Sequence, residues 1–350
     1  MSKTLILTGG GTAGHIMPNL ALLPMLEKEY DKIYYLGSKN SMEEKIIKQY
    51  KNISFVEIPT TKLIRKFTFK NLLIPFKLLN SVCKTKRVIK KIKPSVIFCK
   101  GGFVSVPVAI AGHMCKIPVI AHESDYSMGL ANKIILKFAS TICTTFEDTA
   151  KVSKKCICTG TPIRKQIFEG KKANVLNLFD YDKNKKTILF FGGSLGSKNI
   201  NKLVEQGLDS LLKKYNVLHI TGKGNKLNIK EKGYYQVEFT NKIEDFFDAS
   251  DLVVCRGGAN SLFELLALKK QMIIIPLSKA ESRGDQLENA DYFKKNNLAE
   301  VMLEENMSVE LLINKIDDIF QRKLNVNTTS KYFGLTPNKK IEECECISLL

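Results

Sequence analysis

The stretch Thr4-Leu-Ile-Leu-Thr-Gly-Gly-Gly-Thr-Ala-Gly-His15 decides the fold. Its first five residues form a short apolar run that predicts a buried β-strand, and the glycines after it predict a tight turn into a helix. Glycine lets backbone N–H groups approach an anion, and the start of a helix adds a favourable dipole. The stretch therefore predicts the first strand, anion-binding loop and helix of a doubly wound α/β domain.

The chain repeats this design. Thr187-Ile-Leu-Phe-Phe-Gly-Gly193 echoes the first stretch, and Val96-Ile-Phe-Cys-Lys-Gly-Gly102 is echoed by Leu252-Val-Val-Cys-Arg-Gly-Gly258. Short apolar runs that alternate with helical patterns are typical of parallel sheets covered by helices on both faces. We predict strands at 4–8, 32–36, 96–99, 119–121, 187–191, 217–220, 252–255 and 272–275. The expected fold class is α/β, with two doubly wound domains.

Length and composition agree with two domains. The chain has 350 residues, of which 44% are hydrophobic and 25% charged, a globular composition. The polar stretch from Gly160 to Lys186 is the expected linker, so we expect domains over 1–162 and 163–334, with a C-terminal helix at 335–350 joining the first. The N-terminus lacks a signal-peptide pattern, and no apolar stretch approaches the ~20 residues of a spanning helix, which predicts a cytoplasmic protein.

The formal charge of +19 is concentrated in one block. Residues 51–100 hold thirteen Lys and Arg against one acid, Glu57, which predicts an anionic partner. Apolar and basic residues interleave within this block, a pattern that fits a membrane-binding face and also an ordinary amphipathic core helix. We expect no nucleic-acid partner, because no module with aromatic platforms is present. The candidate membrane face consists of Leu63, Arg65, Lys66, Phe67, Phe69, Lys70, Leu72, Leu73, Phe76, Lys77 and Leu79.

Four glycine loops follow predicted strands, at the sheet edge where open α/β folds bind ligands. They begin at Gly9, Lys100, Gly192 and Arg256. Each could be only a tight strand-to-helix turn, but four of them favour binding of a diphosphate. The first also matches the dinucleotide fingerprint, which requires an acid at the end of the second strand. That strand ends in Gly37-Ser38 here, and Glu43 comes later in the next helix, which disfavours a nicotinamide or flavin cofactor.

Glu264 follows the fourth loop and is predicted to lie in the first turn of the next helix. A carboxylate there can accept hydrogen bonds from the two hydroxyls of a ribose, although it could also complement the helix dipole. The loop and the carboxylate together predict a nucleotide site. No metal is expected, because Cys156-x-Cys158 and Cys344-x-Cys346 lack the spacing of a zinc site.

Taken in order, these motifs resemble glycosyltransferase family 28, the N-acetylglucosaminyltransferases of bacterial peptidoglycan synthesis. The resemblance runs from Thr4 to about Phe293 and rests on Gly9–His15, Lys100–Ser105, His122–Asp125, Gly129–Lys133, Gly160–Arg164, Gly192–Gly196, Cys255–Ala259 and Gly284–Ala290. It implies the GT-B fold, in which two Rossmann-like domains face each other across a cleft. It also implies a peripheral enzyme on the cytoplasmic face of the cell membrane, active in cell-wall biogenesis, cell shape and cell division.

The implied reaction moves GlcNAc from UDP-GlcNAc to the C4 hydroxyl of MurNAc in undecaprenyl-pyrophosphoryl-MurNAc-pentapeptide, with inversion and without a cofactor. Further implied partners are anionic inner-leaflet lipid and a cell-wall synthesis complex. Inversion needs a base for the acceptor hydroxyl. His15 is the first candidate because histidine titrates near neutrality, and Glu123 is the competing candidate. Helix N-termini, rather than a metal, would offset the charge on departing UDP.

The resemblance implies further site residues. Glu264 would hold the ribose, Thr240 would lie at the uracil, and Gln286 with Asp285 would contact the sugar. The whole donor-binding set is Thr12, Ala13, Gly14, His15, Asp125, Arg164, Ser194, Thr240, Gly258, Ala259, Asn260, Ser261, Glu264, Asp285 and Gln286. The acceptor-side set is Gly10, Gly11, Gly101, Gly102, Phe103, Ser105, Glu123 and Asn132. The family more often carries other residues at Asp125, Thr161 and Asp285.

Three other functions would keep part of this pattern. They are a GT-B transferase acting on another lipid, a UDP-GlcNAc 2-epimerase, and a non-catalytic, membrane-associated UDP-sugar-binding protein. The binding protein would need neither His15 nor the second acceptor loop, Gly101–Ser105. Both are present, which favours catalysis.

Overall fold

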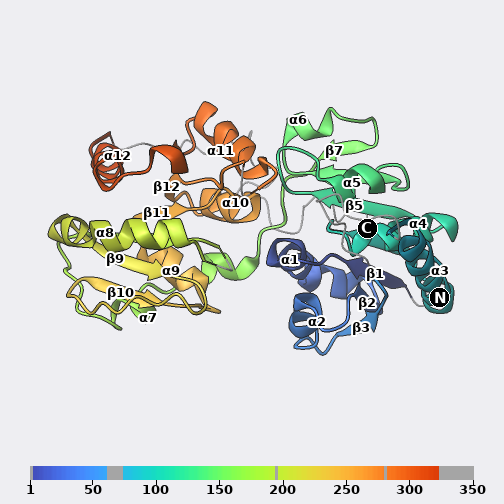
Figure 1. Ribbon diagram of the computed structural model, residues 1–350. Coiled ribbons are helices and arrows are strands. Elements are labelled where there is room, and N and C mark those ends of the chain that lie inside the picture. The colour runs from blue at the N-terminus through green and yellow to red at the C-terminus, as the bar shows by residue number, and fades with distance from the viewer. Residues whose placement is uncertain (1–2, 61–73, 194–195, 280–281, 323–350) are drawn as a thin grey trace. The chain divides into compact units, whose positions relative to one another are not determined.

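The computed structural model describes residues 3–60, 74–193, 196–279 and 282–322 (Figure 1). The predicted helix at 335–350, Ser194 and the members of the candidate membrane face from Leu63 to Leu73 lie outside these ranges. The chain divides into two compact units between Arg164 and Lys165.

The first unit is built on a parallel sheet. Its strands are β1 (Thr4–Thr8), β2 (Lys32–Gly37), β3 (Ile53–Glu57), β4 (Val96–Cys99), β5 (Val119–Glu123), β6 (Thr141–Thr144) and β7 (Cys156–Cys158). Their spatial order is β3-β2-β1-β4-β5-β6-β7, with Leu5 of β1 opposite both Ile33 of β2 and Val96 of β4. The helices are α1 (Ala13–Glu29), α2 (Met42–Ile47), α3 (Ile74–Ile92), α4 (Ser105–Met114), α5 (Leu130–Ile135) and α6 (Glu147–Ala150). The strand order reverses between β1 and β4, and their glycine loops leave the sheet there.

The second unit repeats this topology. Its strands are β8 (Lys186–Phe191), β9 (Tyr215–Ile220), β10 (Tyr234–Val237), β11 (Leu252–Cys255), β12 (Gln271–Ile274) and β13 (Glu300–Val301), in the parallel order β10-β9-β8-β11-β12-β13. The helices are α7 (Ala173–Leu176), α8 (Lys198–Lys214), α9 (Ile243–Ala249), α10 (Ala259–Ala267), α11 (Asp285–Lys295) and α12 (Val309–Arg322). Two 3₁₀ turns, η2 (Lys165–Glu169) and η3 (Glu304–Asn306), complete it.

The inner strands β1, β4, β5 and β11 are buried along their whole length, which explains their continuous apolar character. Ile6 packs with residues of α3 and α4 on one face of the first sheet, while Leu5 and Leu7 pack with α1 on the other. All three side chains are 0% exposed. Burial of each stabilises the fold by about 1.5–3 kcal/mol. Within the described residues, no helix has the length and apolar character needed to span a membrane.

The expected linker from Gly160 to Lys186 is largely part of the second unit. The backbone N–H of Lys171 donates to Asp245 Oδ1 of α9 at 2.8 Å, and Asn174 donates to the other oxygen of that carboxylate at 2.9 Å. These bonds fix α7 and the segment after η2 on the second unit, so the boundary between the units lies near the start of the predicted 160–186 stretch and the rest of that stretch packs as part of the second unit. A polar, lysine-rich composition does not distinguish a linker from a packed surface segment.

Candidate functional site

The two glycine loops of the first unit lie against each other at the carboxyl ends of β1 and β4. A Cβ on Gly102 would lie 2.4 Å from the Gly10 carbonyl oxygen and 3.2 Å from His15 Nδ1, and Gly102 has a φ of +78°. A Cβ on Gly11 would lie 3.1 Å from the ring of Phe103. Only glycine allows this close approach at Gly102. The fold thus brings five of the predicted site residues together.

The hydrogen bonds of His15 determine which ring nitrogen carries its proton. Nδ1 lies 2.9 Å from the carbonyl oxygen of Gly10 and 3.1 Å from the hydroxyl oxygen of Thr12. A carbonyl can only accept, so we assign the proton of the neutral ring to Nδ1. The lone pair then lies on Nε2, the nitrogen that can accept a proton.

Glu123, the competing candidate base, is already held by the protein. Its side chain is buried at the end of β5, and its carboxylate accepts hydrogen bonds from Asp125 N at 3.1 Å, Gly129 N at 2.9 Å and Asn132 Nδ2 at 2.9 Å. These three bonds fix the segment that leads into α5. Asn132 also lies beside Gly101, because its amide nitrogen would be 3.3 Å from a Cβ there. The carboxylate has little capacity left for a substrate hydroxyl.

Glu43 is a site residue that the sequence reasoning missed. It is 1% exposed, and its carboxylate accepts from Ser38 N at 3.2 Å and from Gly11 N at 3.4 Å. Ser41 caps the start of α2 by accepting from Glu44 N at 3.1 Å, and the helix then turns Glu43 back toward the first loop. An acid therefore does reach the loop, although it does not follow β2 directly. The Ser-Met-Glu-Glu sequence at 41–44 is the capping signal that predicts this helix start.

Lys100, the residue after β4, is 2% exposed. Its ammonium group donates to His122 Nδ1 at 2.6 Å and to the Ser124 hydroxyl. His122 Nε2 lies 2.8 Å from the carbonyl oxygen of Gly160 and donates to it. Burial, and then the neighbouring Lys100 charge, lower the pKa of His122 well below its usual value. Lys100 therefore contacts a neutral imidazole.

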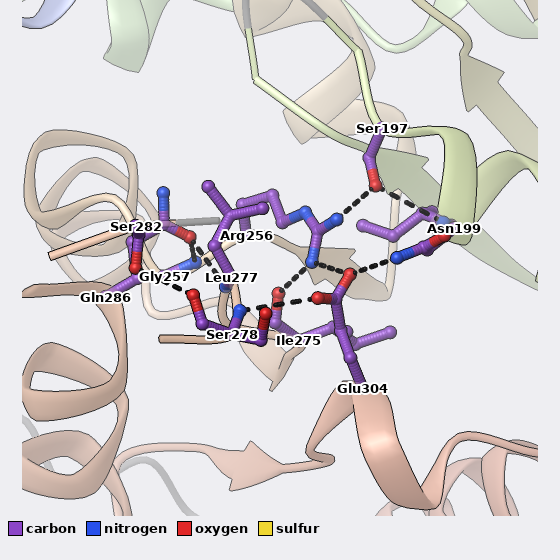
Figure 2. Close-up of polar contacts among 11 residues, drawn as sticks. Ser197, Asn199, Arg256, Gly257, Ile275, Leu277, Ser278, Ser282, Gln286 and Glu304 are labelled. Atoms are coloured by element: carbon purple, nitrogen blue, oxygen red, sulfur yellow. Dashed lines mark hydrogen bonds and ion pairs between the residues drawn. The ribbon is translucent and has the colours of Figure 1, made fainter. Parts of the chain in front are cut away.

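Arg256, the residue after β11, occupies the corresponding place in the second unit, and Figure 2 shows its contacts. It forms an ion pair with Glu304 at 2.6 Å and donates to the Ile275 carbonyl at 3.1 Å and to the Ser197 hydroxyl at 2.6 Å. The Arg256 and Glu304 side chains are each 9% exposed. Burial raises the pKa of Glu304, but hydrogen bonds from Asn199 and Arg256 outweigh it, and the net pKa lies below the usual value.

The fourth loop is shorter than predicted. α10 begins at Ala259, after Gly258 in an extended conformation with a φ of −75°. Asn260 and Ser261 are therefore in the first turn of the helix and Glu264 is in its second turn, which corrects the prediction that Glu264 lies in the first turn. Ala-Asn-Ser can start a helix as readily as it can form a turn. Among the described residues, no atom lies within 4 Å of a Cβ at Gly258, so in this part of the structure the start of α10 leaves room for a ligand.

Gln286 and Asp285, expected at the sugar, begin α11. Gln286 Oε1 accepts from Gly257 N at 3.2 Å and from Leu277 N at 3.1 Å (Figure 2). These bonds commit the side-chain oxygen to the protein and leave its NH₂ group for other contacts. Asp285 forms an ion pair with Arg283 at 3.3 Å.

The predicted residues separate by unit. Ser105 uses its hydroxyl inside the first unit, where it donates to the Gly101 carbonyl at 2.7 Å, and Thr240 accepts from Lys242 N at 2.9 Å in the second. The expected donor-binding residues of the first unit are Thr12, Ala13, Gly14, His15, Asp125 and Arg164, and the described ones of the second are Thr240, Gly258, Ala259, Asn260, Ser261, Glu264, Asp285 and Gln286.

Comparison with known proteins finds matches to the same glycosyltransferase family in both units. Residues 5–144 match the glycosyltransferase family 28 N-terminal domain, and residues 187–343 match the family's C-terminal domain. A Clostridium botulinum (strain Hall) protein, a "UDP-N-acetylglucosamine--N-acetylmuramyl-(pentapeptide) pyrophosphoryl-undecaprenol N-acetylglucosamine transferase", is 47% identical over 335 residues, 94% of each chain. A Clostridium tetani protein of the same name is 43% identical over 328 residues, 92% of this chain and 91% of its own.

The fold agrees with these sequence matches. The crystal structure of Acinetobacter baumannii MurG matches with a TM-score of 0.76 and 23% identity, over 99% of this chain and 100% of that one. The predicted α/β class, with two Rossmann-like domains of the GT-B type, is confirmed.

Proposed function

The chain belongs to glycosyltransferase family 28, and from this premise we propose that it transfers GlcNAc from UDP-GlcNAc to undecaprenyl-pyrophosphoryl-MurNAc-pentapeptide. One observation carries the proposal: the 47% identity to a Clostridium botulinum enzyme named for this reaction extends over 94% of the chain. Such a match includes both units. The product is the disaccharide lipid intermediate from which peptidoglycan is built.

His15 is the base that we assign to the reaction. The C4 hydroxyl of MurNAc gives its proton to Nε2, its oxygen attacks the anomeric carbon of GlcNAc, and the bond from that carbon to the β-phosphate oxygen breaks. UDP leaves with the electron pair, and the anomeric configuration inverts. The bond from Nδ1 to the Gly10 carbonyl at 2.9 Å supports this role, because it keeps the lone pair on Nε2. The three donors on Glu123 favour a structural role for that residue.

The donor side is assigned to the start of α10. The backbone amides that begin this helix would hold the UDP phosphates, and the helix dipole would offset the charge that develops on the leaving group. Glu264 would hold the ribose hydroxyls. The open space in front of Gly258 supports this assignment, and the proposed mechanism includes neither a metal nor another cofactor.

Contact with anionic inner-leaflet lipid is assigned to the outer side of α3. Phe76 is 70% exposed and Leu79 is 61% exposed, and Lys77 between them is exposed as well. Val82 and Ile89 of the same helix are buried in the core. The core-helix interpretation therefore applies to the face of α3 that packs in the core. The membrane interpretation applies to its outer face, which offers apolar and basic groups to a lipid surface. This supports a peripheral enzyme.

The test is transfer of radiolabelled GlcNAc from UDP-GlcNAc to a lipid-pyrophosphoryl-MurNAc-pentapeptide analogue. Diacylglycerol as acceptor and UDP-glucose as donor are the controls. We expect the radiolabel on the muramyl lipid only, greatly reduced turnover with intact UDP binding in His15→Ala, and weaker UDP binding in Glu264→Ala. A wild-type protein that binds UDP-GlcNAc but leaves the muramyl lipid unmodified would overturn the acceptor assignment and with it the peptidoglycan role.

A further inference from the structure

Glu304 is a charged residue with a side chain only 9% exposed, and no sequence motif includes it. It lies in η3, just after β13 and 48 positions beyond Arg256 in the chain. β13 pairs with β12, which in turn pairs with β11, so the topology brings η3 to the edge where the glycine loops leave the sheet. Glu304 thus reaches the donor side of the second unit through the fold.

The Glu304 carboxylate connects several segments of the second unit (Figure 2). Oε1 accepts from Arg256 at 2.6 Å and from Asn199 Nδ2 at 2.7 Å, while Oε2 accepts from the backbone N–H of Ser278 at 3.3 Å. Arg256 extends the network to the Ser197 hydroxyl at 2.6 Å. Ser197 is the N-cap residue of α8, directly after the third glycine loop.

The same network continues to Gln286. The N–H groups of Leu277 and Ser278 are consecutive, and they donate to Gln286 and to Glu304 respectively. Gln286 also accepts from Gly257, the residue next to Arg256. Glu304 is therefore connected to the three segments expected to surround the donor, which are the start of α8, the start of α10 and the start of α11.

We propose that Glu304 is a positioning residue for the donor nucleotide: by holding Arg256, it fixes the start of α8 relative to the start of α10 around the diphosphate. The inference rests on the proposed function of this site. Glu304 also neutralises the Arg256 charge, so the pair supplies geometry rather than a net positive charge. If Arg256 acted only through its positive charge, removal of the Glu304 charge would lower the Kd for UDP. A positioning role of Glu304 predicts a higher Kd, so the Kd distinguishes the two roles.

The discriminating variant is Glu304→Gln, which preserves size and removes the charge. A glutamine cannot accept at both positions, because its NH₂ group replaces one carboxylate oxygen. We expect the Kd for UDP and the KM for UDP-GlcNAc to rise about tenfold, as expected when a hydrogen bond to a charged group is lost. The KM for the lipid acceptor and the kcat at saturating donor should stay within about twofold to threefold, and Glu304→Ala should show a larger rise in the donor constants.

The matched control is Glu300→Gln. Glu300 lies on neighbouring β13 and forms an ion pair with Lys315 at 2.8 Å, and none of its described contacts is with the loop network. This variant should leave both donor constants unchanged. An unchanged or lower Kd for UDP in folded Glu304→Gln would overturn the inference while the proposed function stands. A wild-type protein that does not bind UDP would overturn both.

Discussion

The Lys-Gly-Gly motif at 100–102 and the Arg-Gly-Gly motif at 256–258 follow corresponding strands of two similar sheets, yet their surroundings differ. Lys100 donates to the neutral ring of His122 and to a hydroxyl, whereas Arg256 forms an ion pair with Glu304. Gly102 has a φ of +78° and packs against Gly10, whereas Gly258 has a φ of −75° and no described residue lies within 4 Å of a Cβ there.

The different surroundings of Gly102 and Gly258 indicate two different reasons for a glycine at these positions. In the first unit, the packing of one loop on another requires glycine at 102. In the second unit, no atom of the described residues excludes a side chain at 258, and the backbone conformation there suits any residue. For Gly258 we propose the close approach of the donor as a reason. The same motif therefore packs one loop on another in the first unit and, on this proposal, leaves room for the donor in the second.

Arg256→Met should give the largest effect, because it removes the cation of the Arg256–Glu304 ion pair. It leaves the Glu304 carboxylate buried without its cation, which costs about 3–5 kcal/mol. Urea unfolding followed by circular dichroism measures the loss, since the chain contains no tryptophan for fluorescence. The double variant Arg256→Met/Glu304→Leu should recover most of it, because both charges are gone. A single-variant loss below about 1 kcal/mol would contradict a buried, functioning ion pair.

Alanine substitutions at Gly102 and at Gly258 test whether the two motifs differ. Gly102→Ala forces a left-handed residue and places a Cβ 2.4 Å from a backbone oxygen, which should cost about 2–4 kcal/mol. Gly258→Ala should change stability by less than about 0.5 kcal/mol and yet weaken UDP binding about tenfold. Urea unfolding and calorimetric titration with UDP measure the two quantities. Equal stability losses, or a Gly258→Ala variant with normal UDP affinity, would remove the distinction between the motifs.

Lys100→Met should cost less than Arg256→Met. Its hydrogen bonds to His122 and Ser124 go to neutral groups, so their loss leaves polar atoms rather than a charge unsatisfied, at about 1–2 kcal/mol. The same urea experiment compares the two variants directly. A loss as large as that of Arg256→Met would mean that Lys100 is as strongly paired as Arg256.

Acid should produce an effect that is small just below pH 6.5, grows with each further pH unit and is spread over both units. Burial and Lys100 lower the pKa of His122, and burial lowers the pKa of His219 to about 3. Below about pH 6.5 the unfolded chain therefore binds protons that the folded chain does not. Stability is fully present above that pH and should fall by about 1.4 kcal/mol per pH unit for each histidine as the pH is lowered.

Proton NMR of the four histidines checks this prediction and its cause. The His122 and His219 signals should not titrate between pH 5 and pH 8. In Lys100→Met the pKa of His122 should rise but stay below the usual value, because burial is the larger cause. Titration of His122 near pH 6.5 in the wild type would contradict the assigned neutral ring.

The sequence predicts those features that depend on neighbours along the chain. The strands at 4–8, 96–99 and 252–255 agree with the structure because each is buried on both faces, which makes its whole length apolar. The start of α10 was placed too late because Ala-Asn-Ser suits both a turn and a helix. Such local ambiguity is resolved by the packing of the helix on the sheet.

The missed residues depend on contacts that local sequence does not encode. Glu43 returns to the first loop because α2 begins just before it, and Glu304 meets Arg256 because β13 adds to the sheet beside β12. Neither acid has a fixed spacing to its partner that a motif could describe. The sequence thus predicted the loops and candidate ligands, whereas the residues that hold those loops required the three-dimensional arrangement.

The open space in front of Gly258 has a consequence for how this gene would change if its product were no longer needed. Alanine at 258 would leave the fold intact, so it could spread by drift as soon as selection on substrate use ended. Alanine at 102 would still be removed as long as selection acted against misfolded protein. On the proposed role of Gly258, the two glycines would therefore be lost at different times, and substitution at 258 would precede any loss of the fold.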